Sequence, residues 1–127
     1  MAIEFSTQDM LRGKILSPDW YTLIIDKIEE RLSKDGGSTN IWFEATVIKN
    51  ASTGSTEFEG VPLRWCMNSK FSSTIMAFLK LFGVEPELGK KYTFAFAEGK
   101  QVDYFVQNKM FENRVINEIT NQFRLPR

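Results

Sequence analysis

Apolar and polar residues alternate along the first half of the chain with the period of two that is typical of β-strands. Residues 20–28 are rich in β-branched and aromatic side chains and predict a long, buried strand. In residues 40–48 the apolar positions share one face, and Trp42 falls on the other face with Glu44 and Thr46. We therefore expect the Trp42 indole to point outward, either as a free stacking surface or packed under the N-terminal segment or a second copy.

A third strand is predicted over residues 57–67, after turn clusters at 33–39 and 50–55 that are rich in Gly, Ser, Asn and Asp. Arg64 alternates with the apolar Leu63 and Trp65, so it should lie on the outer face of this strand. If consecutive strands pair, the guanidinium lies near the indole of the second strand. The alternative for Arg64 is an exposed ion pair with a nearby Glu, which contributes little energy.

The hydrophobic period changes from 2 to 3.6 after residue 70, which predicts a helix over about 72–82. Ser69 or Ser72 is the expected N-cap, and Gly83 is placed to end the helix. One apolar stripe is expected to face the core, and its members are Phe71, Ile75, Phe78, Leu79 and Phe82.

The second half of the chain returns to alternation. Strands are predicted over 90–97, 102–111 and 114–119, with a hairpin turn at 98–101 and a tight turn at Glu112-Asn113. Aromatic residues on already apolar strands are assigned to the core, namely Trp20, Tyr21, Trp65, Phe94 and Phe96.

The predicted order is three strands, one helix and two or three further strands. A single helix between the third and fourth strands of an antiparallel sheet is typical of the OB-fold. We therefore expect a mostly β protein, an OB-fold-like Greek-key barrel of five to six strands, as one domain over residues 1–127. Residues 1–13 form an N-terminal arm with a helical turn capped by Ser6, and residues 120–127 form a tail. A β-sandwich with an inserted helix, or another small barrel, is the alternative.

Composition narrows the chemistry. The 127 residues contain 16 Lys and Arg, 16 Asp and Glu, one Cys and no His. Zero formal net charge excludes nucleic-acid coating by bulk charge, so any such site must be a local patch. Without His or paired Cys, no metal site, cofactor or catalytic constellation is indicated, and we expect a protein that is not an enzyme. No signal peptide or membrane span is found, so a cytoplasmic location is expected.

Six short segments, taken in order, resemble small phage-encoded single-stranded-DNA-binding proteins of the OB-fold type. They are Pro18-Asp19-Trp20-Tyr21, Ser33-Lys34-Asp35-Gly36-Gly37, Phe58-Glu59-Gly60-Val61-Pro62, Leu81-Phe82-Gly83-Val84, Gly89-Lys90-Lys91 and Phe111-Glu112-Asn113-Arg114-Val115-Ile116-Asn117. The resemblance covers most of residues 13–120. It implies an OB-fold protein that coats single strands in phage replication or recombination, and that meets replication or recombination proteins. Many such proteins end in an acidic tail, whereas residues 123–127 here are basic.

Single-strand binding needs aromatic faces for the bases and cations for the phosphates. The candidate binding residues lie on the second and third strands, in the loops and at the last hairpin, and they are Lys34, Trp42, Arg64, Lys70, Lys100, Lys109, Phe111 and Arg114. The same lysines can be merely solubilising, and the hairpin tip can be a contact between copies in a homo-oligomer. DNA and RNA are not distinguished by these residues. The alternative function is a non-catalytic small β-barrel that acts in protein interaction or as a phage structural or adaptor protein.

Overall fold

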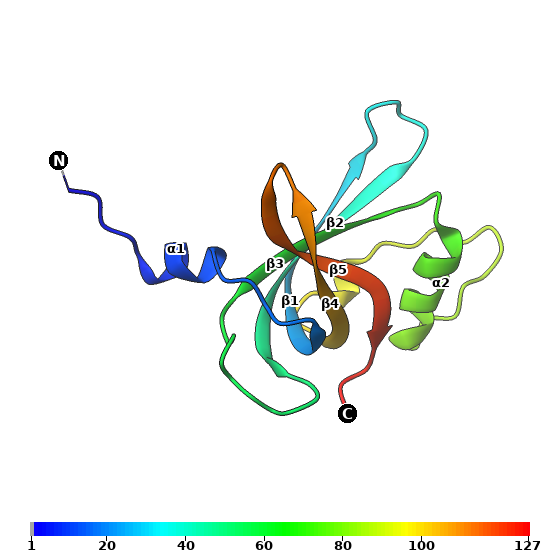
Figure 1. Ribbon diagram of the computed structural model, residues 1–127. Coiled ribbons are helices and arrows are strands. Elements are labelled where there is room, and N and C mark those ends of the chain that lie inside the picture. Colours follow the sequence, from blue (N-terminus) through cyan, green and yellow to red (C-terminus); the bar gives the residue numbers. More distant parts are fainter. Residues whose placement is uncertain (1) are drawn as a thin grey trace.

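The computed structural model describes residues 2–127, and its centre is one antiparallel sheet of five strands (Figure 1). A short N-terminal helix, α1 (Thr7–Arg12), precedes the sheet, and a second helix, α2 (Ser72–Leu81), follows its third strand. The strands are β1 (Asp19–Leu32), β2 (Thr39–Asn50), β3 (Pro62–Asn68), β4 (Gln101–Phe111) and β5 (Arg114–Arg124). Within residues 2–127, neither α-helix has the length and apolarity required to cross a bilayer.

The strand order is β3-β2-β1-β4-β5, and β1 is shared between the two halves of the sheet. β1 pairs with β2 over nearly its whole length and with β4 only over Asp19–Ile24. A register shift between Ile25 and Lys27 marks a β-bulge, which lets the long strand bend. The two end strands, β3 and β5, contact each other. The sheet therefore curls around a core, and the expected mostly β, OB-fold-like arrangement is confirmed with five strands rather than six.

The hydrophobic core lies on the concave side of the sheet and is rich in aromatic rings. Ile41, Phe43, Ala45 and Val47 are buried, which confirms the predicted inner face of β2. The Phe43 ring stacks on Trp65 of β3 with a centroid distance of 5.1 Å. Phe78 of α2 is fully buried and meets Phe43 edge-on at 5.4 Å, so α2 packs its apolar stripe onto the core.

The predicted strand over residues 90–97 is wrong. Residues 84–94 form a loop, followed by a 3-10 helix, η1 (Ala95–Ala97). The Tyr92 hydroxyl accepts a hydrogen bond from the Glu87 N–H and donates to the Glu85 carbonyl, which folds the loop on itself. The free edge of β1 is taken by β4, so this segment does not pair with β1. Its alternating aromatic residues instead pack the loop against the core. Consequently, residues 98–101 do not form a hairpin turn.

Four other expectations are corrected. Phe71 is 68% exposed and occupies the N-cap position of α2 without a side-chain cap, so it is not in the core. Neither Ser69 nor Ser72 caps the helix, because the Ser69 hydroxyl accepts the Thr39 N–H instead. Trp20 and Phe96 are only half-buried. Residues 120–124 belong to β5 rather than to a tail.

The N-terminal arm is anchored at its base and free at its tip. Ser6 caps α1, as predicted, in a capping box with Asp9, and Gly13 follows the end of the helix. Leu11 packs against Gly60, whose positive φ of 89° and close approach to the Leu11 side chain both favour glycine. The Asn117 side chain of β5 accepts the buried Leu16 N–H at 2.8 Å and donates to the Lys14 carbonyl at 3.0 Å. Residues 11–16 therefore lie against the barrel, while α1 itself buries no side chain.

Candidate nucleic-acid interface

The Trp42 indole and the Arg64 guanidinium stack on the outer face of the sheet. In the register of β2 and β3, Glu44 is opposite Arg64 and Cys66 is opposite Trp42, so the two side chains are diagonal neighbours on one face. The guanidinium carbon lies 4.2 Å from the centroid of the indole. Trp42 is half-buried, and the Arg64 side chain is 51% exposed. The predicted proximity of these two residues is therefore confirmed, and both remain accessible to solvent.

The charges around this stack are balanced. The charged side chains near the stack include three acidic and three basic ones from β1, β2 and β3, namely Asp26, Glu29, Glu44, Lys27, Arg31 and Arg64. Arg31 binds both carboxylate oxygens of Glu29 at 2.9 and 2.8 Å, and this contact lowers the pKa of Glu29. Arg64 approaches Glu44 only to 3.9 Å, the ion pair that was the alternative for this residue. Because exposed pairs at such distances are weak, a phosphate can replace Glu44 at little cost.

Arg12 joins this face from the N-terminal arm. A hollow of about 450 Å³ is lined by Arg12 and Arg64, by the carboxylates Asp26 and Glu44, and by further residues of β2 and β3. A second hollow, of about 300 Å³, is lined by Arg12 together with Arg114 and Val115 at the start of β5. Arg12 thus lines both hollows, one together with Arg64 and the other together with Arg114. No sequence signal indicates Arg12 as a binding residue, because its position depends on how the arm is anchored.

Two hairpins rise from the same side of the sheet (Figure 1). The β1–β2 loop carries Lys34, which is exposed, and Asp35, which pairs with Lys70 at 3.8 Å. The Ser33 hydroxyl and the Gly37 N–H both donate hydrogen bonds to the Asp35 carboxylate. These bonds lower the pKa of Asp35 and favour its ionised form. Lys70 is therefore held beside the β1–β2 loop that carries Lys34, and its ammonium is already paired.

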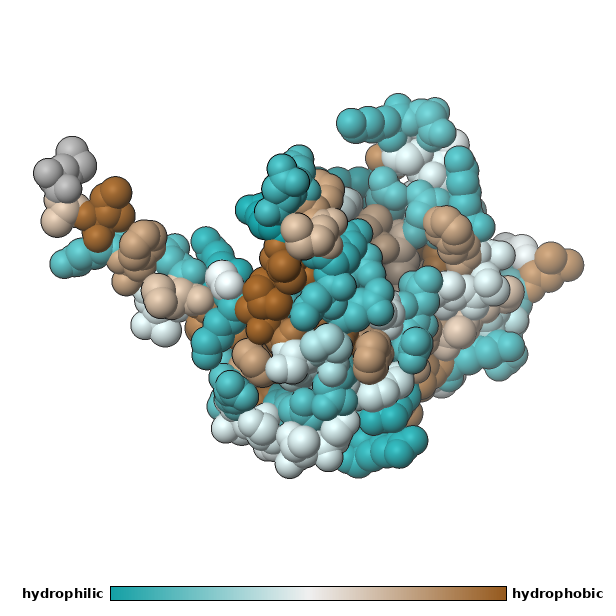
Figure 2. All heavy atoms as spheres, viewed as in Figure 1, coloured by the Kyte–Doolittle hydropathy of each residue, from teal (hydrophilic) through white to brown (hydrophobic). Residues whose placement is uncertain are grey.

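The β4–β5 hairpin carries the other predicted candidates. Its tip is the tight turn Glu112-Asn113, in which both residues have positive φ, as a two-residue turn of this type requires. Phe111 is 49% exposed, and Arg114 is exposed beside it. Lys109 is less available for contact with a ligand, because its ammonium pairs with the Glu118 carboxylate at 3.0 Å. Figure 2 shows hydrophilic side chains over both hairpin tips and an apolar area where the arm meets the β4–β5 hairpin.

Lys100 is not brought to this face. It precedes β4, and its carbonyl accepts the Ile25 N–H on the edge of β1 away from β2 and β3. It is exposed but separated from Trp42 by the width of β1.

A second indole–guanidinium stack, formed by Trp20 and Arg124, lies elsewhere on the barrel and differs in how its cation is paired. The Arg124 guanidinium is 4.0 Å from the Trp20 ring centroid, and Phe105 meets Trp20 edge-on. Arg124 also pairs with Asp103 at 3.5 Å, and the Asp103 side chain is 1% exposed and accepts the Thr22 hydroxyl at 2.6 Å. This cation is neutralised inside the protein, so the Trp20 stack is structural, whereas the Trp42 stack is open.

Residues 2–127 contain no group of three or more His, Cys, Asp or Glu side chains placed to hold a metal ion. The one thiol, Cys66, lies beside Trp42, and partial desolvation raises its pKa, which favours the neutral form. No known protein-family model matches the chain, and no curated protein matches its sequence.

Proposed function

We propose that this protein binds single-stranded DNA non-catalytically and with little sequence preference, and that it coats and protects single strands during phage replication or recombination. The observation that carries the proposal is the Arg64 guanidinium stacked at 4.2 Å on the outward indole of Trp42. Aromatic side chains stack on bases regardless of sequence, since every base has a π-face, and this contact contributes about 1–3 kcal/mol per base.

The route of the strand follows from the cations. A base stacks on the Trp42–Arg64 pair, and its neighbouring phosphates contact Arg64, Arg12 and Arg114. Lys34 and Lys70 flank one end of this route, and Phe111 offers a second ring at the other end. Each phosphate contact on a single strand adds about −0.7 to the slope of log K against log salt, so three contacts give a slope of about −2. A rise from 50 to 200 mM salt should then weaken binding about 20-fold.

The proposal is tested by fluorescence anisotropy with labelled oligo-dT, with oligo-U and duplex DNA of equal length as competitors. Binding of oligo-dT in preference to duplex, with a salt slope near the predicted value, supports it. Comparable binding of oligo-U would extend the partner to RNA, because no residue here is placed to read a 2′-hydroxyl. Absence of binding at micromolar protein in low salt would reject it and favour the alternative, a protein-interaction or phage structural barrel.

A further inference from the structure

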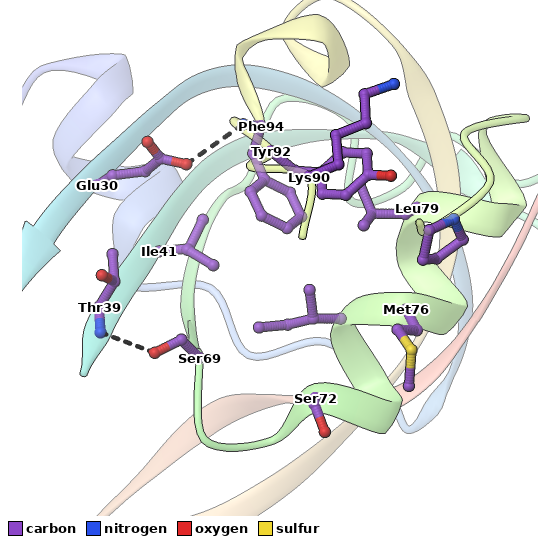
Figure 3. A pocket seen from close by; sticks show the side chains of 12 residues that line it. Glu30, Thr39, Ile41, Ser69, Ser72, Met76, Leu79, Lys90, Tyr92 and Phe94 are labelled. Atoms are coloured by element: carbon purple, nitrogen blue, oxygen red, sulfur yellow. Dashed lines mark hydrogen bonds between the residues drawn. The ribbon is translucent and has the colours of Figure 1, made fainter. Parts of the chain in front are cut away.

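A hollow lies between α2, the start of β2 and the loop that replaces the predicted strand (Figure 3). Its volume is about 530 Å³, within the roughly 300–1,000 Å³ range of protein binding pockets. Its walls are mainly apolar, and Figure 3 shows side chains of β2, the helix and the loop around it, among them Ile41, Leu79, Tyr92 and Phe94. The hollow is on the α2 side of the barrel and takes no part in the Trp42 face.

One acidic and one basic residue, Glu30 and Lys90, line opposite sides of this hollow (Figure 3). The Glu30 carboxylate accepts the Phe94 N–H at 3.3 Å, whereas Lys90 is the one cation of the lining. The Lys90 ammonium lies 5.4 Å from the Tyr92 ring centroid. No carboxylate of residues 2–127 lies within ion-pair distance of it. An occupant that combines apolar side chains with one carboxylate would match this site.

The tip of the N-terminal arm has that composition. Ile3 is 78% exposed and Phe5 is 72% exposed, and Glu4 stands between them. In an extended backbone, residues i and i+2 point to the same side about 7 Å apart, while the residue between them points away. Ile3 and Phe5 can therefore enter one hollow together, and Glu4 is left at its rim.

The arm cannot fill the hollow of its own barrel. Residues 11–16 hold the base of the arm against Gly60 and Asn117, and the arm then extends away from the sheet on the side opposite α2 (Figure 1). Large apolar side chains at the end of an anchored, outward arm need a second molecule to be buried.

We propose that the Ile3-Glu4-Phe5 segment of one molecule inserts into the hollow beside α2 of a second copy, with Glu4 paired to Lys90. Because the donor and acceptor sites lie on opposite sides of the barrel, the contact is heterologous and generates a head-to-tail chain rather than a closed dimer. Two side chains of this size and the walls that cover them bury roughly 800 Å² in total, below the about 1,200 Å² of stable complexes. Association is therefore weak and concentration-dependent.

The test uses sedimentation velocity of the full chain without nucleic acid, so its result is independent of the proposed function. The wild type should sediment as a 14.7 kDa monomer at low concentration and as a growing series of oligomers toward about 1 mM, where weak contacts are populated. The arm variant Ile3→Ser/Phe5→Ser keeps the hollow, and Met76→Glu places a charge in it at a position that is already 42% exposed. Each variant alone should stay monomeric.

Mixing the two variants gives the decisive outcome. The Met76→Glu chain still donates an arm, and the Ile3→Ser/Phe5→Ser chain still accepts one, so the mixture should form a 1:1 dimer and nothing larger. Leu88→Ser removes an exposed apolar side chain outside the hollow and should associate like the wild type. A wild type that remains monomeric throughout, or a mixture without the dimer, would overturn the proposal.

The charge pair has its own test. Lys90→Glu should weaken the association, and adding Glu4→Lys to the same chain should restore it. Restoration identifies the contact itself, because a general loss of folding would not be repaired by a change in the arm. Equal association of the single and double variants would contradict this pairing.

Discussion

Replacing Trp42 with alanine removes the ring on which the proposed base contact depends. Base–aromatic stacking contributes about 1–3 kcal/mol, so the affinity for oligo-dT should fall about 5- to 150-fold. The variant also loses the contact between the indole and Arg64 at 4.2 Å, which costs the folded state about 0.5–1 kcal/mol. Since Trp42 is outside the buried core, the protein should remain folded. Anisotropy titration measures the affinity, and circular dichroism checks the fold.

Two variants control this experiment. Trp42→Phe keeps an aromatic ring and should retain a larger part of the affinity than Trp42→Ala. Trp20→Phe changes the indole of the other cation stack, whose Arg124 is neutralised by a buried carboxylate, and should bind like the wild type. The reasoning is refuted if folded Trp42→Ala binds within about twofold of the wild type, a difference far smaller than one stacked base contributes.

Three further predictions concern the arm and the fold. Arg12→Ala should reduce the salt slope by about 0.7, and titrations at several salt concentrations would show an unchanged slope if Arg12 contacts no phosphate. Asn117→Ala should lower the free energy of unfolding in urea by about 1–3 kcal/mol, because the buried Leu16 N–H loses its acceptor; a stability equal to the wild type would show that this bond contributes nothing. Hydrogen bonds from the side chains of Asn50 and Ser52 lower the pKa of Asp19 below its ordinary 3.8. This carboxylate therefore stabilises the fold above about pH 4, and the contribution is lost as the pH falls through the lowered pKa. Asp19→Asn should reduce this loss of stability at acid pH, measured as the melting temperature against pH. A pH profile equal to that of the wild type would argue against the role of Asp19.

The inner and outer faces of the central strands could be predicted because they depend on local alternation. The period of two placed Phe43 inward and Trp42 outward. Pairing of consecutive strands was the simplest arrangement for β2 and β3, and this brought Arg64 beside Trp42. The turn at Glu112-Asn113 followed from the polar pair between two apolar stretches.

The error over residues 90–97 has a different origin. This segment alternates as clearly as the true strands, but β1 has only one edge free after pairing with β2, and β4 occupies it. Alternation shows that one side of a segment is buried, not which backbone it bonds to. The Phe94 N–H, for instance, donates to the Glu30 side chain rather than to a neighbouring strand.

The position of Arg12 on the arm could not be predicted from the sequence pattern either. Arg12 is placed by the packing of Leu11 on Gly60 and by the two hydrogen bonds of Asn117, contacts between residues that are more than 40 positions apart. The predicted capping of α1 is local and was confirmed. Where that helix then lies is a tertiary property.

The central claim is that an unpaired base stacks on Trp42, and the chain offers a direct measurement of it. It contains three tryptophans, so a nitrogen-15-labelled sample gives three indole N–H resonances. On titration with oligo-dT, the resonance of Trp42 should shift, while those of the core Trp65 and the structural Trp20 should stay in place. Saturating oligo-dT that leaves the Trp42 resonance unmoved would contradict the account.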